Sequence, residues 1–416
     1  TRFRCPLPAE ALGYTAMPDY QFPGEWGSAG YNSAGVGMSS TETIFSSEKA
    51  LSADPYVEDG LAENCTYNIV LPYIRTAREG VERLGMLIEK YGSAEGFGIG
   101  FIDCSEVWYL ENACGHYWLA CRIPCDSYFV TGNQSRYRDY DPHDNENFMA
   151  SAGLVAFAER NGLYDPAYGK FDFHEAYSRD EKLDVTYNYP RVWALQQMFS
   201  PAISNDVTSN TFPVFAQAEK TIGISELRKA FRFHYNDTDH DPYLHCNGRE
   251  PYRPVSIFRT TQTHLLQVRP ELPRAIGCMT YVAMGMADLG VFLPLYQGVK
   301  SYPEAYSKGN GHADSESAYW KFRKVMTLGM TDYNAYAPLI KETYSRLEVE
   351  NDQRQKEMEA EYLKIFNTEP MKAQDMLQQF SDNILNKALD VADGLTEELF
   401  TRLTQNIQKE YLFHGA

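Results

Sequence analysis

A cysteine beside a histidine is the first pair in this sequence that could do chemistry. Cys246 follows His245, and a thiol next to an imidazole is a common combination for nucleophilic catalysis. Catalytic dyads usually join residues that are distant in the chain, so we do not predict a dyad between these neighbours. Cys104, at a strand end before Ser105, is a second thiol candidate, for which a packed thiol is the favoured interpretation.

An aspartate-rich loop could bind a cation. Residues 236–241 alternate acidic and polar side chains as a calcium loop does, with His234 and His245 nearby. The loop lacks the glycine and the terminal glutamate of an EF-hand, so a solvated loop is the favoured interpretation. The sequence has no C-x-x-C pair, P-loop, G-x-S-x-G elbow or dinucleotide fingerprint. We therefore predict no metal and no organic cofactor.

Other polar residues lie at or near predicted strand ends. Asn133, with Gln134 and Ser135, follows the strand predicted at residues 128–131, where an amide often only forms a turn. His116 and Trp118 share one face of another strand by their period of two, and packing is the default explanation for them. Taken separately, none of these residues decides a function.

The elements that must position these residues follow from periodicity. Two short strands of small residues are predicted within residues 30–42, joined by a glycine-containing turn. Residues 77–91 carry apolar side chains at helical spacing and stop at Gly92. Further helices are predicted at 61–76, 148–160 and 191–199, and further strands at 97–103, 106–111, 117–123, 128–131, 255–258, 264–268 and 279–284.

The last part of the chain predicts a helical hairpin. A helix at about residues 333–366 is separated by residues 367–370 from a second helix, whose apolar residues recur every three or four positions. We expect a domain at residues 1–330 and the hairpin, residues 331–416, packed on it. Helices, strands and helices in this order predict an α+β fold. The stripe of the second helix consists of Met376, Phe380, Ile384, Ala388, Val391, Leu395, Leu399 and Leu403.

Composition and charge exclude several classes of partner. The 416 residues carry a formal net charge of -18, and no basic stripe offsets it, so we predict no nucleic-acid partner. No apolar stretch is long enough to span a membrane, and residues 1–6 do not read as a signal peptide. Eight cysteines without a paired motif predict free thiols and a cytoplasmic location.

Several short segments between about residues 12 and 323 together resemble one protein family, although no single segment does so alone. The central block reads SEVWYLE (105–111), GHYWLACRIP (115–124) and NQ (133–134), with GYN (30–32), SSTET (39–43), YIRTAREG (73–80), RTTQTH (259–264), LQVR (266–269) and FLPLY (292–296) around it. In this order the blocks resemble the bacterial cysteine dipeptidases of the N-terminal-nucleophile (Ntn) hydrolase superfamily.

The resemblance implies an αββα sandwich of antiparallel sheets and an acyl-enzyme mechanism. In this superfamily a cysteine at residue one attacks the amide and its own α-amine is the base, which is reasonable because a free α-amine titrates near ~7.7. The resemblance places Asn133 as the oxyanion donor and Arg259 as an active-site arginine. It places Asn32 and Glu42 on the strand pair that lines the substrate cleft.

Glu42 supports a hypothesis about substrate choice. A dipeptidase must prefer a free amino terminus, and a carboxylate in the cleft provides a charge-assisted partner for that ammonium group. We therefore predict that Glu42 binds the substrate ammonium. The alternative is a glutamate that serves only in a structural hydrogen bond.

The sequence also departs from the family pattern. Gln262 stands where the family has glutamate, and Tyr117, Cys114, Cys121 and Cys125 replace a His, a Gly, an Arg and an Asp, which puts fine specificity in doubt. The chain opens at what resembles a later stretch of the family, LP…YTAMPD (7–19). We therefore expect the first strand pair, with the nucleophile, to be missing, and the 416 residues alone to be inactive.

Two classes of function remain open at this point. The first is a dipeptidase whose nucleophile lies outside these residues, with Thr1 and Cys5 both poorly placed for that role because no strand-forming run follows them. The second is a non-catalytic binding or assembly protein on the same fold, and an amidase of acylated amines is an intermediate alternative. In each case the hairpin is a candidate for self-association into a homo-oligomer.

Overall fold

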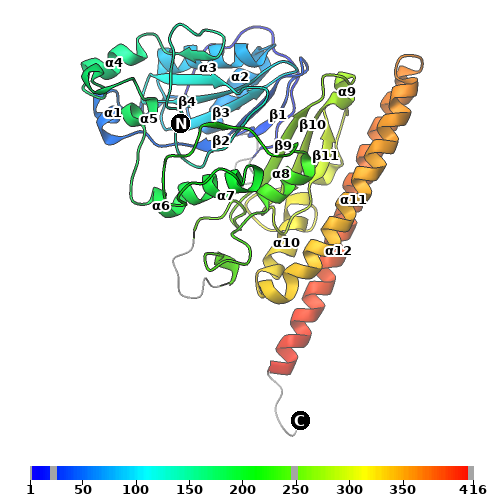
Figure 1. Ribbon diagram of the computed structural model, residues 1–416. Helices are drawn as coiled ribbons and strands as arrows, with labels where there is room; N and C mark the ends of the chain where they lie inside the picture. The colour runs from blue at the N-terminus through cyan, green and yellow to red at the C-terminus, as the bar shows by residue number, and fades with distance from the viewer. Residues whose placement is uncertain (1, 19–25, 245–251, 411–416) are drawn as a thin grey trace. The chain divides into compact units, whose positions relative to one another are not determined.

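The computed structural model describes residues 2–18, 26–244 and 252–410, except for the side chains of residues 41 and 42 (Figure 1). The chain forms two compact units. The first comprises Thr1–Ile224, Pro251–Arg253 and Val268–Pro270, and the rest of the chain forms the second. Among the described helices, none is both long enough and apolar enough to cross a membrane. The predicted boundary at residue 330 stays a prediction.

A six-stranded antiparallel sheet is the centre of the first unit (Figure 1). Successive side chains of a strand point to opposite faces, so the sheet has two buried faces. Leu110 and Ala120 belong to the core on one face, whereas Tyr109 and Leu119 belong to the core on the other. The strands, in their order across the sheet, are β1 (Ala29–Tyr31), β2 (Gly37–Thr43), β3 (Phe97–Ile102), β4 (Val107–Asn112), β5 (Trp118–Arg122) and β7 (Phe148–Ala150).

Helices α2 (Glu63–Val70) and α3 (Ala77–Tyr91) cover the first face of this sheet (Figure 1). Thr76 caps α3 by accepting a hydrogen bond from the Glu79 backbone N–H, and the helix ends at Gly92, where the glycine stop predicted it. The apolar stripe of α3 is buried, which confirms the prediction from its spacing. The helix lies so close to the sheet that a Cβ at Gly85 would come 2.1 Å from the Trp118 ring.

Short helices pack on the second face of the sheet. The core there includes Phe157, Phe173 and Tyr177, which pack with Tyr109 and Leu119 of the strands. A two-stranded sheet lies in the same unit, and the loop that follows its first strand carries Asn133. These elements are α1 (Glu48–Ala53), α4 (Leu154–Arg160), α5 (Phe173–Tyr177), α6 (Asp184–Tyr187), α7 (Tyr189–Phe199), β6 (Tyr128–Phe129) and β8 (Phe215–Ala216).

The second unit combines a three-stranded sheet with a helical hairpin. The strand order is β11-β10-β9, and β10 and β11 are antiparallel. Helix α10 packs with the two hairpin helices on one continuous apolar core. The elements are α8 (Ile224–Phe231), β9 (Gln262–Val268), α9 (Arg274–Gly277), β10 (Cys278–Met284), β11 (Leu293–Tyr296), α10 (Ala318–Gly329), α11 (Tyr333–Ile365) and α12 (Pro370–Glu410).

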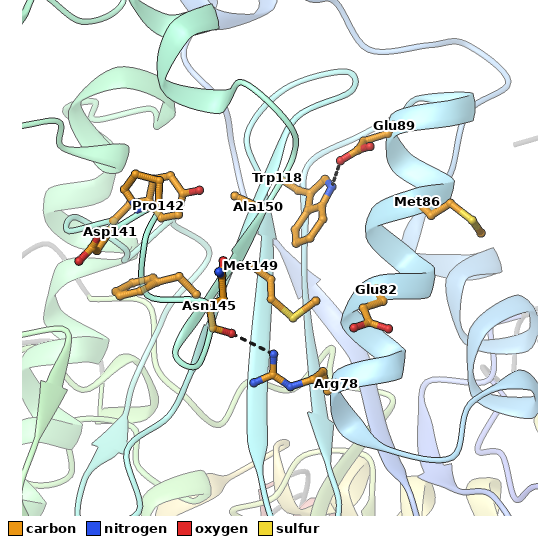
Figure 2. A pocket seen from close by; sticks show the side chains of 12 residues that line it. Arg78, Glu82, Met86, Glu89, Trp118, Asp141, Pro142, Asn145, Met149 and Ala150 are labelled. Carbon is orange, nitrogen blue, oxygen red and sulfur yellow. Dashed lines mark hydrogen bonds between the residues drawn. The ribbon is translucent and has the colours of Figure 1, made fainter.

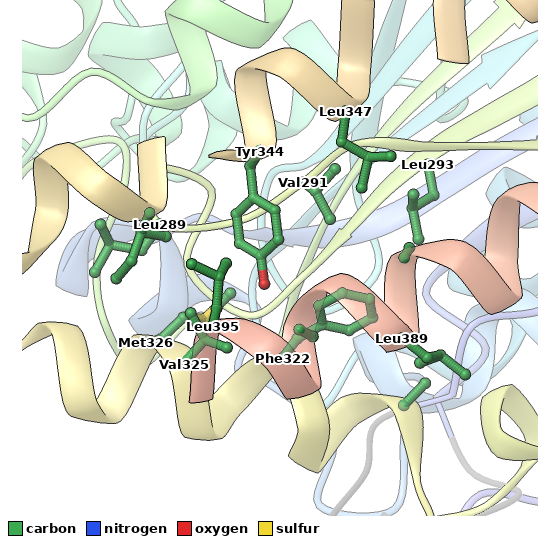
Figure 3. Close-up of a cluster of buried hydrophobic side chains, with 14 of the residues drawn as sticks. Leu289, Val291, Leu293, Phe322, Val325, Met326, Tyr344, Leu347, Leu389 and Leu395 are labelled. Atoms are coloured by element: carbon green, nitrogen blue, oxygen red, sulfur yellow. The ribbon is translucent and has the colours of Figure 1, made fainter. Parts of the chain in front are cut away.

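The hairpin predicted from the sequence is confirmed. Helix α11 has 33 residues and α12 has 41, and residues 366–369 join them. Tyr344 and Leu347 of α11 point into the same core as Leu389 and Leu395 of α12 and Phe322 of α10 (Figure 3). Burial of this shared apolar surface, about 25 cal/mol per Å², holds the long helices together.

Three local predictions are wrong, and each has a physical reason. Residues 255–258 form no strand, because the Ser256 backbone N–H donates to the Phe233 carbonyl instead of to a neighbouring strand. The helix predicted at 61–76 stops at Val70, because Pro72 has no N–H to continue it. The helix predicted at 148–160 begins only at Leu154, because β7 pairs with β5 first. The architecture as a whole is α+β with antiparallel strand pairs and a C-terminal helical region, as predicted.

Candidate active site

Asn133 lies in the loop after β6, and its side chain is held at the end of β2. Its Nδ2 donates to the Thr43 carbonyl over 3.0 Å, so it reaches the residue that follows Glu42. Its backbone is clamped by a second amide: Asn133 N donates to Asn188 Oδ1 over 2.8 Å, and Asn188 Nδ2 donates back to the Asn133 carbonyl over 3.1 Å. The predicted position of Asn133 at a sheet end is thus fixed by a residue 55 positions further along the chain.

Two guanidinium groups set the orientation of the Asn133 amide. Arg191 donates to Asn133 Oδ1 over 2.9 Å and Arg253 donates to the same atom over 2.8 Å. A guanidinium can only donate hydrogen bonds, so the atom that faces both of them must be the amide oxygen. The Nδ2 group therefore faces away from them, and the second of its two N–H groups makes no hydrogen bond within the described part of the chain. We call Asn133, Asn188, Arg191 and Arg253 the Asn133 cluster.

Tyr187 supports both guanidinium groups of the Asn133 cluster. The Arg253 guanidinium carbon lies 4.1 Å from the centre of the Tyr187 ring and the Arg191 carbon lies 5.3 Å from it. Arg191 Nε also donates to the Tyr187 carbonyl over 2.9 Å, and the Arg253 backbone N–H donates to the Thr186 carbonyl over 3.0 Å. Cation–π stacking and these anchors restrict the two long side chains before any ligand arrives.

The buried carboxylate of Asp184 holds Asn188 of the Asn133 cluster in place. Asp184, 1% exposed, accepts a 2.5 Å hydrogen bond from Asn188 Nδ2 and a 3.1 Å bond from Arg179. Arg179 in turn stacks at 4.0 Å on the ring of Phe45, two residues beyond the end of β2. The residues that hold the Asn133 cluster therefore come from β2, α6, α7 and the loops beside them.

Glu111 and Ser135 anchor the next turn of the same loop. The Glu111 side chain is fully buried in β4 and accepts hydrogen bonds from Ser135 Oγ (2.5 Å) and from the Arg136 backbone N–H (2.9 Å). Burial raises the pKa of this carboxyl to about 7, although the bonds to Ser135 and Arg136 oppose that shift. Burial likewise lowers the pKa of Arg136 to about 10. A glutamate in the centre of an apolar strand was the signal in the sequence that could have identified this anchor.

Asn32, another predicted site residue, lies at the opposite end of β2 from the Asn133 contact. Asn32 is fully buried at the turn before β2, and its side chain donates to the carbonyls of Leu71 and Ile74 and accepts from two backbone N–H groups of its own turn. Seven residues of β2 separate that turn from the end near Asn133, a distance of roughly 20 Å at ~3.3 Å per residue. These contacts show a residue that shapes the β1–β2 turn, and contact with substrate stays a prediction.

Glu42 and Arg259 remain predictions as well. Glu42 pairs with Gly98 through the backbone of β2 and β3, next to Thr43, but its side chain lies outside the described residues. Arg259 belongs to the second unit and its side chain is exposed. Among the described residues, Arg191 and Arg253 donate to Asn133, and no pattern in the sequence singles them out.

Comparison with known proteins decides the family of this chain. A family model described as peptidase family C69 matches residues 1–346. The chain belongs to peptidase family C69. It is 53% identical over 310 residues to a probable dipeptidase of Salmonella dublin, covering 74% of this chain and 72% of that protein. It is 33% identical over 336 residues to a probable dipeptidase of Latilactobacillus sakei (80% and 70% covered) and 30% identical over 398 residues to dipeptidase A of Lactobacillus helveticus (93% and 83% covered).

Membership of family C69 raises the question of a nucleophile, and four of the described cysteines have a raised pKa. Burial raises the pKa of Cys5, Cys65, Cys114 and Cys121, which keeps these thiols protonated near neutral pH. Cys246 and His245, the neighbouring pair noted in the sequence, lie outside the described residues. Cys104 is exposed in the turn between β3 and β4.

The aspartate-rich loop of this family C69 chain is built around a histidine in the second unit. His234 Nδ1 lies 3.0 Å from Asp241 Oδ1, and Nε2 lies 2.9 Å from the Tyr333 hydroxyl. Tyr333 donates to Asp288 over 2.6 Å, and Lys341 Nζ lies 2.8 Å from Asp288 Oδ1. We call these five residues the His234 cluster. In the part of the chain that the structure describes, no three His, Cys, Asp or Glu side chains form a metal-binding group.

A pocket on the first unit lies between α3 and the edge strand β7 (Figure 2). It has a volume of about 470 Å³. Its main donors bond within the chain: Arg78 donates to the carbonyls of Asn145 and Glu146, and Trp118 Nε1 donates to Glu89. We interpret the pocket as the seam where residues 141–147 pack on α3. The remaining lining residues are Glu82, Met86, Tyr140, Asp141, Pro142, Phe148, Met149 and Ala150.

Proposed function

We propose that this chain acts as a cysteine-type dipeptidase, which hydrolyses the peptide bond of dipeptides through a thioester acyl-enzyme. Membership of peptidase family C69 and relatives named as dipeptidases support this reaction. In the proposal the nucleophile is a cysteine with a free α-amine, and the amine takes the thiol proton. We assign this role to no residue between Thr1 and Ala416.

The observation that carries the proposal is the oriented amide of Asn133. Attack on a peptide carbonyl places negative charge on its oxygen, and a fixed N–H donor directed at that oxygen stabilises the transition state by about 3 kcal/mol. Asn133 offers such a donor, because Arg191 and Arg253 hold its oxygen and leave a second Nδ2 N–H without a partner in the described chain. Two nearby guanidinium groups add positive potential where the charge develops.

The remaining roles follow from position. Glu42, on the strand end that Asn133 contacts, is proposed to bind the substrate ammonium group, which selects free dipeptides over N-acylated ones. Arg259 is proposed to support the charge of the nucleophile. Asn32 is proposed to act through the turn between β1 and β2 that it holds together.

The fold and the location are parts of the same proposal. Antiparallel sheets, with α2 and α3 on one face in the first unit and α10 to α12 packed with β-strand residues in the second, support the Ntn αββα sandwich. The seven described cysteines form no disulfide within the described residues, which supports a reducing, cytoplasmic setting. Self-association through the hairpin stays a prediction.

The test is dipeptide hydrolysis by the protein expressed from its full open reading frame. We expect Asn133→Ala and Asn133→Asp to lower kcat on the order of 100-fold with a small change in KM, because both remove the N–H donor. Alkylation of the amino-terminal thiol, mapped by mass spectrometry, should remain. The matched control is Asn161→Ala, which removes only a bond to the Phe157 carbonyl at the end of α4.

Two results would contradict the proposal. An unchanged kcat in both Asn133 variants would remove Asn133 from the mechanism. A wild-type protein that cleaves no dipeptide and resists alkylation at its amino end would instead indicate a non-catalytic binding protein, and equal cleavage of N-acetylated and free dipeptides would indicate an amidase.

A further inference from the structure

The two arginines of the Asn133 cluster have a position that the oxyanion role does not explain. One donor would suffice to orient the Asn133 amide, but both Arg191 and Arg253 reach its oxygen, at 2.9 and 2.8 Å. Arg191 is tied in further, because it also donates to Asn188 Oδ1 over 2.6 Å and to the Tyr187 carbonyl. Arg253 has a different environment: its guanidinium stacks at 4.1 Å on the Tyr187 ring and meets Asn133 through a single nitrogen.

We propose that Arg253, with Arg191 beside it, binds the α-carboxylate of the dipeptide substrate and so restricts the enzyme to dipeptides. This inference rests on the proposed function, in which Asn133 contacts the scissile carbonyl oxygen. Arg253 is then a substrate-binding residue, and Arg191 is a positioning residue for Asn133.

The reach of a dipeptide fits this arrangement. The carboxylate of a dipeptide follows its scissile bond by a single residue, which spans at most ~3.5 Å. Arg253 Nη1 lies 2.8 Å from Asn133 Oδ1. The proposed oxyanion donor, Nδ2, belongs to the same side-chain amide. When the scissile carbonyl oxygen of a dipeptide accepts from Asn133 Nδ2, the carboxylate of that dipeptide is within reach of the guanidinium groups. In a longer peptide, each added residue moves the carboxylate up to ~3.5 Å further away.

The chemistry of the group also fits a carboxylate. Guanidinium groups bind carboxylates through two parallel N–H donors, and this geometry gives both affinity and orientation. A guanidinium has five N–H donors, so its bond to Asn133 does not prevent a second acceptor from binding alongside. Stacking on Tyr187 restricts Arg253 in advance, which reduces the side-chain entropy that binding would otherwise cost.

The negative charge next to the Asn133 cluster, that of Asp184, already has partners in the chain. The nearby buried carboxylate of Asp184 bonds to Arg179 and to Asn188. The polar amide of Asn188 then lies between Asp184 and Arg191. One side-chain amide therefore separates Asp184 from Arg191.

The experiment compares one dipeptide in two forms, alanyl-alanine and its carboxamide, with trialanine as a third substrate. We expect the wild type to prefer the free acid over both others. Arg253→Gln should lower kcat/KM for the free acid on the order of 100-fold, mainly through KM, and lower kcat/KM for the carboxamide by a clearly smaller factor, because only the free acid loses a bound carboxylate. Arg253→Lys should recover part of the loss, because it keeps the charge but not the paired donors. Arg160→Gln, an exposed arginine at the end of α4, is the matched control.

Each other outcome would overturn the inference. Equal losses on the acid and the carboxamide would mean that Arg253 only positions Asn133, and unchanged rates would mean that it does neither. If the wild type cleaves none of the three peptides, the proposed function fails, and the carboxylate site is then judged by calorimetry alone. Binding of alanyl-alanine but not of its carboxamide, lost in Arg253→Gln, would support the site, and equal binding of the two compounds would refute it.

Discussion

The Asn133 cluster and the His234 cluster are both built from buried or half-buried polar groups, but they use their hydrogen bonds differently. In the His234 cluster the imidazole, the Tyr333 hydroxyl, the Lys341 ammonium and the Asp288 carboxylate bond to one another. In the Asn133 cluster one amide N–H points away from its partners and is left for something outside the described chain. The difference indicates that the first set stabilises the fold, whereas the second is prepared to bind.

Without the family resemblance, local sequence patterns do not separate the two clusters. Alternating acids beside His234 resemble a metal loop, whereas Asn133 resembles an ordinary turn former. The orientation of the His234 ring explains why the loop is structural. Both ring nitrogens are held by groups of this chain: Nδ1 lies 3.0 Å from Asp241 Oδ1, and Nε2 lies 2.8 Å from Asn236 Nδ2 and 2.9 Å from the Tyr333 hydroxyl.

The largest effect that we predict follows from removal of the Asp288 side chain, which tests whether the His234 cluster stabilises the fold. We expect Asp288→Ala to lower the free energy of unfolding by about 4 kcal/mol, because it leaves Lys341 and the Tyr333 hydroxyl without their buried acceptor. Peptidase activity per folded molecule should not change. The measurement is urea unfolding combined with a dipeptide assay at a concentration of urea well below the transition.

The control for this variant is an ion pair of the same type on the surface. Glu304→Ala removes the exposed partner of Lys308 and should leave the unfolding free energy nearly unchanged, because solvent screens an exposed ion pair. A large loss of activity in Asp288→Ala under conditions where it stays folded would place the His234 cluster in the mechanism and reverse the comparison.

A second prediction concerns pH and the anchor behind Asn133. The pKa of Glu111 is raised from 4.5 to about 7 in the folded protein, so between these values the folded state holds a proton that the unfolded state has lost. Its contribution to stability therefore falls as pH rises from 4.5 to about 7, by up to about 3 kcal/mol. Glu111→Gln should remove this part of the pH dependence.

Unfolding in urea at several pH values between 4.5 and 7.5 measures that effect. The wild type should lose stability relative to Glu111→Gln as the pH rises through this range. The exposed Glu146→Gln variant is the control and should follow the wild-type curve. A constant difference between wild type and Glu111→Gln at all pH values would show that Glu111 keeps its ordinary pKa.

The smallest predicted effect follows from the addition of a methyl group at Gly132, next to the Asn133 cluster. A Cβ at Gly132 would lie 2.9 Å from Asn188 Oδ1 and 3.2 Å from an Arg191 nitrogen, so Gly132→Ala must displace the clamp. We expect a loss of about 1 kcal/mol in stability and about a 10-fold loss in kcat. Gly13→Ala, where a Cβ would meet no atom within 4 Å, should change neither quantity. Full activity in Gly132→Ala would mean that the amide orientation is not needed for catalysis.

Periodic segments of this chain were predictable because their burial is repetitive. Helix α3 buries its apolar stripe, and α12 buries apolar residues from Ala373 to Leu399. The buried face of α11 is also mostly apolar, but it includes Glu348, Asn351 and Gln355. The absence of a strand at 255–258 was not predictable, because four residues carry no long pattern and the Ser256 backbone N–H bonds to the distant Phe233 carbonyl.

The candidate site was only partly predictable. Asn133 was found through resemblance and its place after a strand, but its partners Asn188, Arg191 and Arg253 lie 55, 58 and 120 positions further along the chain. No local spacing connects residues at such separations. Their meeting depends on how the loop after β6, helix α7 and residue 253 fold together, and that information is tertiary.

The pairing of α11 with α12 in the hairpin limits how the lengths of the two helices can change. Both helices advance 1.5 Å per residue and meet along stripes that repeat about every seven residues. Adding seven residues to each helix would extend the tip by about 10 Å and repeat the same facing side chains. Adding three or four residues to only one helix would instead shift its apolar stripe along the other, so the hairpin can lengthen or shorten only in matched steps.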